Sequence, residues 1–110
     1  MLIPYMEIMA IIPARGGSKG IPLKNLKLLA GKPLLQYSIN GSLKSKFITR
    51  TIVSSDHLKI LKTAKKLGAE IVKRPKNLSN DKATSFSVLK HAVTWLEKNQ
   101  NWKTDIVVLL

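Results

Sequence analysis

The sequence contains no cysteine, which excludes a disulfide-stapled scaffold and a thiolate metal site and suits a reducing compartment. It also lacks a long apolar run, because the stretch 106–110 is far too short to span a bilayer. The N-terminal residues have neither the basic segment nor the small-residue cleavage site of a secretory signal. We therefore expect a cytoplasmic protein without a membrane partner.

Acidic and aromatic residues are also scarce. Six Asp and Glu stand against 19 Lys and Arg, and the resulting net charge of +13 suggests an anionic partner. The lysines are spread along the chain, and aromatic residues make up only 5% of it, too few for a platform on which bases stack. Solvated lysine is favoured over a nucleic-acid surface by roughly three to one, so we expect no specific nucleic-acid partner.

The 110 residues, 45% of them hydrophobic, are enough for one small domain built from alternating patterns. Apolar and β-branched runs predict strands, and amphipathic runs predict helices. Strands are expected at 9–14, 50–55, 70–73 and 106–110, and helices at 33–45, 58–67 and 85–98. This alternation predicts an α/β fold of the Rossmann-like, nucleotide-binding type, with a parallel sheet in the order 3-2-1-4 and flanking helices.

The expected helices carry apolar stripes that should face the sheet. The residues predicted to be on these buried stripes are Leu35, Ile39 and Leu43, then Leu58, Leu61, Ala64 and Leu67, then Phe86, Leu89, Val93 and Leu96. Asp56 stands where the N-cap of the second helix belongs, and Gly68 where that helix ends. His57 and His91 have no partner at a catalytic spacing, so we assign them no catalytic role.

The segment "IIPARGGSKGIPLKN" (11–25) leaves the first expected strand at its carboxyl end, where sheets of this type bind ligands. It matches neither a Walker loop nor the G-x-G-x-x-G fingerprint. Gly16, Gly17 and Gly20 would let backbone N–H groups approach an oxyanion, and Arg15 and Lys24 add positive charge. Taken alone, the segment is equally compatible with a glycine-rich turn that carries solvated lysines.

The longer run "IIPARGGSKGIPLKNLKLLAGKPLL" (11–35) resembles the opening of the acylneuraminate cytidylyltransferases, also called CMP-sialic acid synthetases. The similarity continues through "TIVSSDHLKI" (51–60), "AKKLGAEIVKRP" (64–75) and "LSNDKATS" (78–85). Where the commoner family pattern is D-T-A-S-S, this chain has D-K-A-T-S, and Lys82 is the clearest departure. Enzymes that activate pseudaminic or legionaminic acid share this opening.

The resemblance implies a nucleotidyltransferase fold and transfer of CMP from CTP to a nonulosonic acid, such as N-acetylneuraminate, with release of pyrophosphate. It implies catalytic roles for Arg15 and Lys24 on the triphosphate and for Asn25 near the α-phosphate and ribose. The nucleotide-binding residues that it implies are Arg15, Gly16, Gly17, Ser18, Lys24, Asn25, Arg74, Ala83 and Ser85. Of these, Arg74 would reach the cytosine, while Ala83 and Ser85 would read its edge and the adjoining sugar. The alternative for Arg74 is a solvated strand-end cation, and the alternative for Ser85 is a helix N-cap, a role that it could combine with nucleotide binding.

The resemblance covers the N-terminal part of the family. The family's Mg²⁺-binding acidic residues, sugar pocket and dimer segment come later than Leu110, and the six acidic residues here form no pair typical of a metal site. We therefore expect residues 1–110 to be a single, incomplete nucleotide-binding domain without metal ligands, which alone makes no CMP-sugar. The alternatives are a non-catalytic CTP-binding module and, less favoured, a basic nucleic-acid-binding domain.

Overall fold

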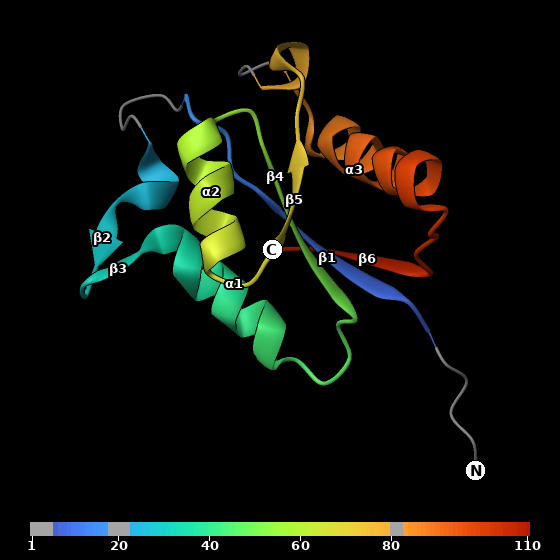
Figure 1. Cartoon of the computed structure of the whole chain (residues 1–110), viewed down its shortest axis with the longest axis horizontal. Coiled ribbons are helices and arrows are strands. Elements are labelled where there is room, and N and C mark those ends of the chain that lie inside the picture. The colour runs from blue at the N-terminus through green and yellow to red at the C-terminus, as the bar shows by residue number, and fades with distance from the viewer. Residues whose placement is uncertain (1–5, 18–22, 80–82) are drawn as a thin grey trace.

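The computed structural model describes residues 6–17, 23–79 and 83–110, and its centre is a four-stranded sheet (Figure 1). The strands are β1 (Ile8–Pro13), β4 (Arg50–Ser55), β5 (Glu70–Lys73) and β6 (Ile106–Leu109). They lie in the order β5-β4-β1-β6, and every pairing in the sheet is parallel. This is the predicted order 3-2-1-4, so the α/β fold and its topology are confirmed.

The helices cover both faces of the sheet, with α1 (Leu34–Lys44) and α2 (Leu58–Lys66) on one face and α3 (Ser85–Gln100) on the other (Figure 1). Successive strand residues point to opposite faces. Ile12 of β1 therefore belongs to the buried cluster beneath α1 and α2, whereas the neighbouring Ile11 belongs to the cluster beneath α3. Burial on both faces explains why these strands read as continuous apolar runs in the sequence.

Each predicted helical stripe contains one residue that the structure places outside the core. The side chains of Leu43, Leu58 and Phe86 are 50%, 64% and 73% exposed, so their predicted burial is wrong. The residues that are buried instead are Ser42 in α1, Ile60 in α2, and Val88 and Ala92 in α3. Ser42 is accommodated because its hydroxyl is hydrogen-bonded to that of Thr51 on β4, at 2.6 Å.

Two predicted helix caps are also wrong. The N-cap of α2 is His57, whose Nδ1 accepts a hydrogen bond from the backbone N–H of Lys59 at 3.2 Å; Asp56 has a different partner, described below. The N-cap of α3 is Thr84, whose Oγ1 accepts from the backbone N–H of Ser87 at 3.1 Å, so Ser85 is the first helical residue.

A small hairpin and two short 3-10 helices were not predicted, and Pro33, predicted to begin the first helix, instead ends the hairpin and is the N-cap residue of α1. The hairpin pairs β2 (Leu28–Leu29) with β3 (Lys32–Pro33), and its two turn residues both have positive φ, 51° at Ala30 and 82° at Gly31. Positive φ at both central residues is typical of two-residue hairpin turns. The 3-10 helices are η1 (Lys24–Leu26) and η2 (Lys76–Leu78).

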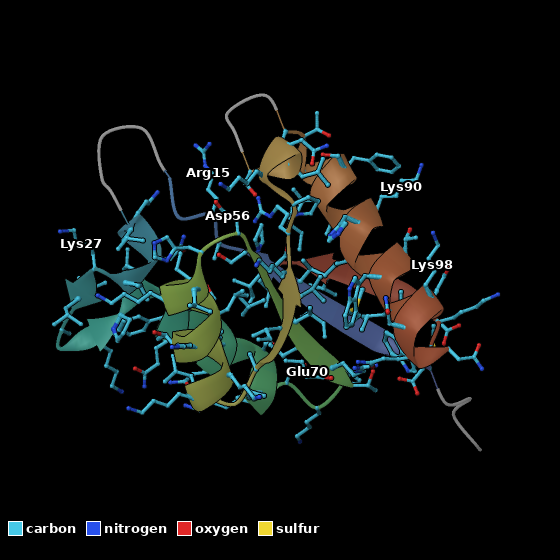
Figure 2. All side chains as sticks on the ribbon, turned by 45° about the horizontal axis from the view of Figure 1, so that its top comes forward. Arg15, Lys27, Asp56, Glu70, Lys90 and Lys98 are labelled. Carbon is cyan, nitrogen blue, oxygen red and sulfur yellow. The ribbon has the colours of Figure 1, made fainter. Side chains whose placement is uncertain are left out.

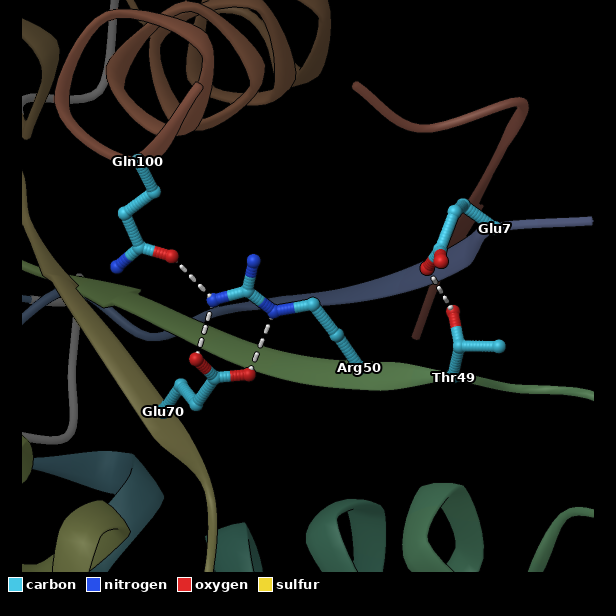
Figure 3. A network of polar contacts seen from close by, with 5 residues as sticks. All are labelled: Glu7, Thr49, Arg50, Glu70 and Gln100. Atoms are coloured by element: carbon cyan, nitrogen blue, oxygen red, sulfur yellow. Dashed lines mark hydrogen bonds and ion pairs between the residues drawn. The ribbon is translucent and has the colours of Figure 1, made fainter. Parts of the chain in front are cut away.

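At the edge of the sheet where the strands begin, Arg50 of β4 connects β5 with the end of α3 (Figure 3). Its guanidinium forms two hydrogen bonds with the carboxylate of Glu70 and a third with Oε1 of Gln100, at 2.6 Å. The same group lies 4.6 Å from the ring centroid of Trp102. Among the described residues, no helix is both long enough and apolar enough to cross a membrane.

Candidate nucleotide-binding site

The opposite edge of the sheet, where the strands end, carries a cavity of about 280 Å³. Residues from three separate segments line it: Pro13, Arg15, Arg74, Ala83, Thr84, Ser85 and Val88. Pro13 ends β1 and Arg15 follows it, whereas Arg74 follows β5. The remaining four residues come from the start of α3 and the two residues before it. Figure 2 shows Arg15 and Asp56 near this edge and Glu70 near the other. The structure therefore brings together four of the predicted site residues: Arg15, Arg74, Ala83 and Ser85.

Arg74 is held in place from within the protein, with only 4% of the residue exposed. Its Nε donates to Oγ of Ser54 at 3.2 Å, its Nη2 to the Ser54 carbonyl at 2.8 Å, and its Nη1 to the Leu78 carbonyl at 3.1 Å. Burial lowers the pKa of this guanidinium, the carboxylate of Asp56 raises it, and the charge of Arg15 lowers it. The alternative of a solvated strand-end cation is therefore wrong for Arg74.

The residues from Gly16 onward that follow Arg15, here called the glycine segment, begin where the turn after β1 closely approaches the turn after β4. Gly16 is buried, and its backbone N–H donates to Oδ1 of Asp56 at 2.9 Å. A Cβ atom added at Gly16 would lie 2.7 Å from both Cβ and Cδ2 of His57, so no larger residue fits without a shift. A Cβ at Gly17, by contrast, would meet no atom within 4 Å. Ser18, the next predicted site residue, lies outside the described residues, as do Gly20 and Lys82.

Lys24 and Asn25 do not line the cavity but lie beside the glycine segment in η1. The N–H of Leu23 donates to the carbonyl of Gly16 at 3.2 Å, which returns the chain to the segment it has just left. Leu23 and Leu26 then pack against the core beneath α1 and α2. These two anchors leave Lys24 exposed and Asn25 half-buried between them.

The start of α3 supplies polar groups to the cavity wall. Thr84 lines the cavity with its neighbours Ala83 and Ser85, although it was not among the predicted site residues. The backbone N–H groups at a helix N-terminus carry partial positive charge, which adds to that of Arg15 and Arg74 and favours an anion. Thr84 could have been identified from the sequence, because it stands between the two predicted site residues Ala83 and Ser85.

The residues that the structure describes do not assemble a metal centre, because no three His, Asp or Glu side chains among them lie together. One acidic side chain near the cavity, Asp56, already accepts the Gly16 N–H. The described residues therefore do not fit a resident Mg²⁺ site. The predicted absence of metal ligands from the whole chain stays a prediction.

Comparison with known proteins assigns the sequence to one family. A family described as Cytidylyltransferase matches residues 9–100. The chain belongs to this cytidylyltransferase family. An N-acylneuraminate cytidylyltransferase from Escherichia coli is 44% identical over 88 residues, which are 80% of this chain and 21% of that protein. A pseudaminic acid cytidylyltransferase from Campylobacter jejuni is 44% identical over 106 residues, which are 96% of this chain and 45% of that protein. The resemblance noted in the sequence is thereby confirmed.

Two solved cytidylyltransferase-type structures share the fold. A CMP:2-keto-3-deoxy-manno-octonic acid synthetase, solved in complex with CTP, superposes with a TM-score of 0.75 at 24% identity, over 94% of this chain and 39% of that one. A cytidylyltransferase from Leptospira borgpetersenii superposes with a TM-score of 0.68 at 20% identity, over 96% of this chain and 41% of that one. The chain thus spans less than half the length of each of these cytidylyltransferases.

Proposed function

We propose that this chain binds CTP at the carboxyl edge of its sheet, as the nucleotide-holding part of an enzyme that transfers CMP to a nonulosonic acid. The observation that carries the proposal is the convergence of Arg15, Arg74 and the start of α3 on one polar cavity in a chain of this family. The Arg15 guanidinium suits phosphate oxygens, while Arg74 and the polar groups at the start of α3 suit the acceptors of a base and a sugar.

The size of the cavity suggests how CTP is divided between the two parts of the site. Ligand pockets are typically about 300–1,000 Å³, and this cavity, at about 280 Å³, is slightly smaller. We therefore place only part of the nucleotide in it, with the cytosine toward Arg74 and with Ala83 and Ser85 at the base edge and sugar. The triphosphate then runs out past Arg15, along the Gly16–Gly17–Ser18 backbone, toward Lys24 and Asn25 in η1.

This arrangement supports in-line transfer by positioning and charge. The anomeric hydroxyl of the sugar acid attacks the α-phosphorus of CTP and gives up its proton to water, the bond to the β-phosphate oxygen breaks, and pyrophosphate leaves. Arg15 and Lys24 hold the triphosphate and offset its charge, and Asn25 orients the α-phosphate. N-Acylneuraminate and pseudaminic acid, named in the relatives, are the candidate acceptors. For the whole enzyme, dependence on Mg²⁺, a homodimeric state and a cytoplasmic location belong to the same proposal.

Calorimetric titration of the full chain with CTP tests the proposal. Replacing Arg15 with Ala removes a charge-assisted hydrogen bond, which should cost about 1.5–3 kcal/mol of binding free energy, or about 10- to 150-fold in affinity. The control is Lys66→Ala, which removes one exposed positive charge in the last turn of α2, at the edge where β5 begins. This variant should bind CTP as the parent does.

The same titration separates the proposal from its alternatives. CTP should bind more tightly than GTP, and a short oligonucleotide should not compete with it. Equal loss of affinity in both variants would mean that CTP senses only the net charge of +13. Unchanged affinity in Arg15→Ala would refute the role of Arg15, and tighter binding of the oligonucleotide would favour a nucleic-acid-binding domain.

A further inference from the structure

The turn after β4 joins the two segments that carry the cavity arginines, although none of its residues lines the cavity. It consists of Ser54 and Ser55, which end β4, and of Asp56 and His57, which lead into α2. We propose that Asp56 is a positioning residue, which fixes the backbone that carries Arg15 and so sets the distance between Arg15 and Arg74. The inference rests on the proposed CTP binding, because that binding gives the position of Arg15 a function.

The backbone on both sides of Arg15 is bonded to this turn. On one side, the N–H of Ala14 donates to the carbonyl of Ser54 at 2.9 Å. On the other, the N–H of Gly16 donates to Oδ1 of Asp56, also at 2.9 Å. The first bond continues the pairing of β1 with β4, but the second depends on a single side chain. Removing the carboxylate of Asp56 would therefore release the backbone at the point where β1 passes into the glycine segment.

Arg74 is fastened to the same turn. Its backbone N–H donates to the carbonyl of Ser55 at 2.8 Å, and its Nη2 donates to the carbonyl of Ser54, the same oxygen that accepts from Ala14. A carbonyl oxygen has two lone pairs and can accept both bonds. The turn thus binds Arg74 through that residue's own backbone and side chain, and it binds Arg15 through the backbone of the two neighbouring residues. These bonds fix the two arginines relative to each other.

The charge of Asp56 suits this position. Arg15 and Arg74 line one cavity. The positive charge of Arg15 lowers the pKa of the Arg74 guanidinium, whereas the negative charge of the Asp56 carboxylate raises it. Asp56 therefore offsets the repulsion between the two like charges that line the cavity. The carboxylate is not needed as a cap for α2, because His57 performs that function.

Two substitutions separate the hydrogen bond of Asp56 from its charge. Asp56→Ala removes both, whereas Asp56→Asn keeps an oxygen that can accept from the Gly16 N–H and removes only the charge. The matched control is Asp105→Ala: Oδ2 of Asp105 accepts from the backbone N–H of Glu7 at 2.8 Å, a bond of the same kind at the opposite edge of the sheet.

The first measurement needs no nucleotide and follows hydrogen exchange of the Gly16 amide by NMR. Exchange should become about tenfold faster in Asp56→Ala, as expected for the loss of one hydrogen bond. It should change little in Asp56→Asn or Asp105→Ala. Unchanged exchange in Asp56→Ala would overturn the inference whether or not the chain binds CTP. Absence of CTP binding by the parent would instead refute the proposed function and leave this measurement to decide the role of Asp56.

The second measurement is CTP affinity, taken at a temperature where circular dichroism shows each variant to be folded. Asp56→Ala should lose about tenfold in affinity, Asp56→Asn should lose less, and Asp105→Ala should match the parent. Faster Gly16 exchange with unchanged CTP affinity would mean that Asp56 supports only the fold, which would overturn the positioning role. If Asp56→Ala fails to fold, Asp56→Asn still decides. CTP affinity equal to the parent's would exclude the role of the charge, and lost Gly16 protection together with that unchanged affinity would also exclude the role of the bond.

Discussion

Replacing Gly16 with Ala is the sharpest structural perturbation of the glycine segment. The new Cβ would lie 2.7 Å from Cβ and Cδ2 of His57 and 2.9 Å from its Cγ, well inside normal contact distance. One of these atoms is a Cβ fixed to the backbone of the α2 N-cap, so a rotation of the imidazole relieves only part of the clash. Overpacking of this kind typically costs about 1–3 kcal/mol of folding free energy.

Urea unfolding followed by circular dichroism measures this cost. For a small domain the free energy of unfolding falls by about 1–3 kcal/mol per molar urea, so Gly16→Ala should lower the midpoint by about 1 M. Gly17→Ala is the matched control, because its Cβ would meet no atom within 4 Å and its φ does not fall in the left-handed range. The control should unfold at the parent's midpoint.

A second substitution traces the cost to its cause. His57→Ala removes Cγ and Cδ2 but keeps Cβ, so the double variant should be more stable than the sum of the two single effects predicts. Equal midpoints for Gly16→Ala and Gly17→Ala would refute the reasoning, because they would mean that the two turns can separate without cost.

Three further substitutions have defined outcomes. Gly41→Ala, at an exposed position inside α1 where a Cβ meets no atom within 4 Å, should stabilise the fold by about 0.5–1 kcal/mol, measured as a higher urea midpoint. Arg50→Ala removes the pair with Glu70 and the contact with Trp102, which should cost about 1–2 kcal/mol of stability without weakening CTP binding, because these residues lie at the other edge of the sheet. Burial, and secondly the charge of Arg74, lower the pKa of His91 in the fold below its ordinary value of 6.5. The unfolded chain therefore binds the proton more readily, so the stability of the parent should decrease as the pH falls below about 6.5, and His91→Gln should show a smaller decrease between pH 7.5 and 5.5.

The sheet could be predicted from the sequence because parallel strands buried on both faces require unbroken apolar runs. The buried residues of the helices were harder to predict from the sequence, as Leu43 shows. A helix advances by about 100° per residue, so Leu43 lies about 80° from the line of Leu35, whereas Ser42 lies only about 20° from it. Ser42 is therefore the buried residue, and its hydroxyl is satisfied by Thr51, a partner that no local pattern could reveal.

The sequence predicted residues that line the cavity but not the residue that holds their backbone in place. Motif similarity pointed to Arg15, Arg74, Ala83 and Ser85, which line one cavity. Asp56 was predicted to be a helix cap, because its sequence position before an amphipathic run fits that role. Its actual partner, the N–H of Gly16, is 40 residues away in the chain. Contacts at such separation follow from the register of β1 and β4 and cannot be read from local sequence.

The bonding of Arg74 decides how its proposed contact with cytosine can be examined. A guanidinium has five N–H donors, and three bonds, one from each of its nitrogens, go to Ser54 and Leu78. At most two donors then remain for a ligand, one on each terminal nitrogen. Substitution of Arg74 would break all three bonds and leave the hydroxyl and carbonyl of Ser54 buried with fewer partners. Loss of CTP binding in such a variant could therefore result from a disturbed fold as well as from a lost contact with the base. The preference for CTP over GTP in the unmodified chain is the cleaner measure, because it changes the base while Arg74 keeps its three partners.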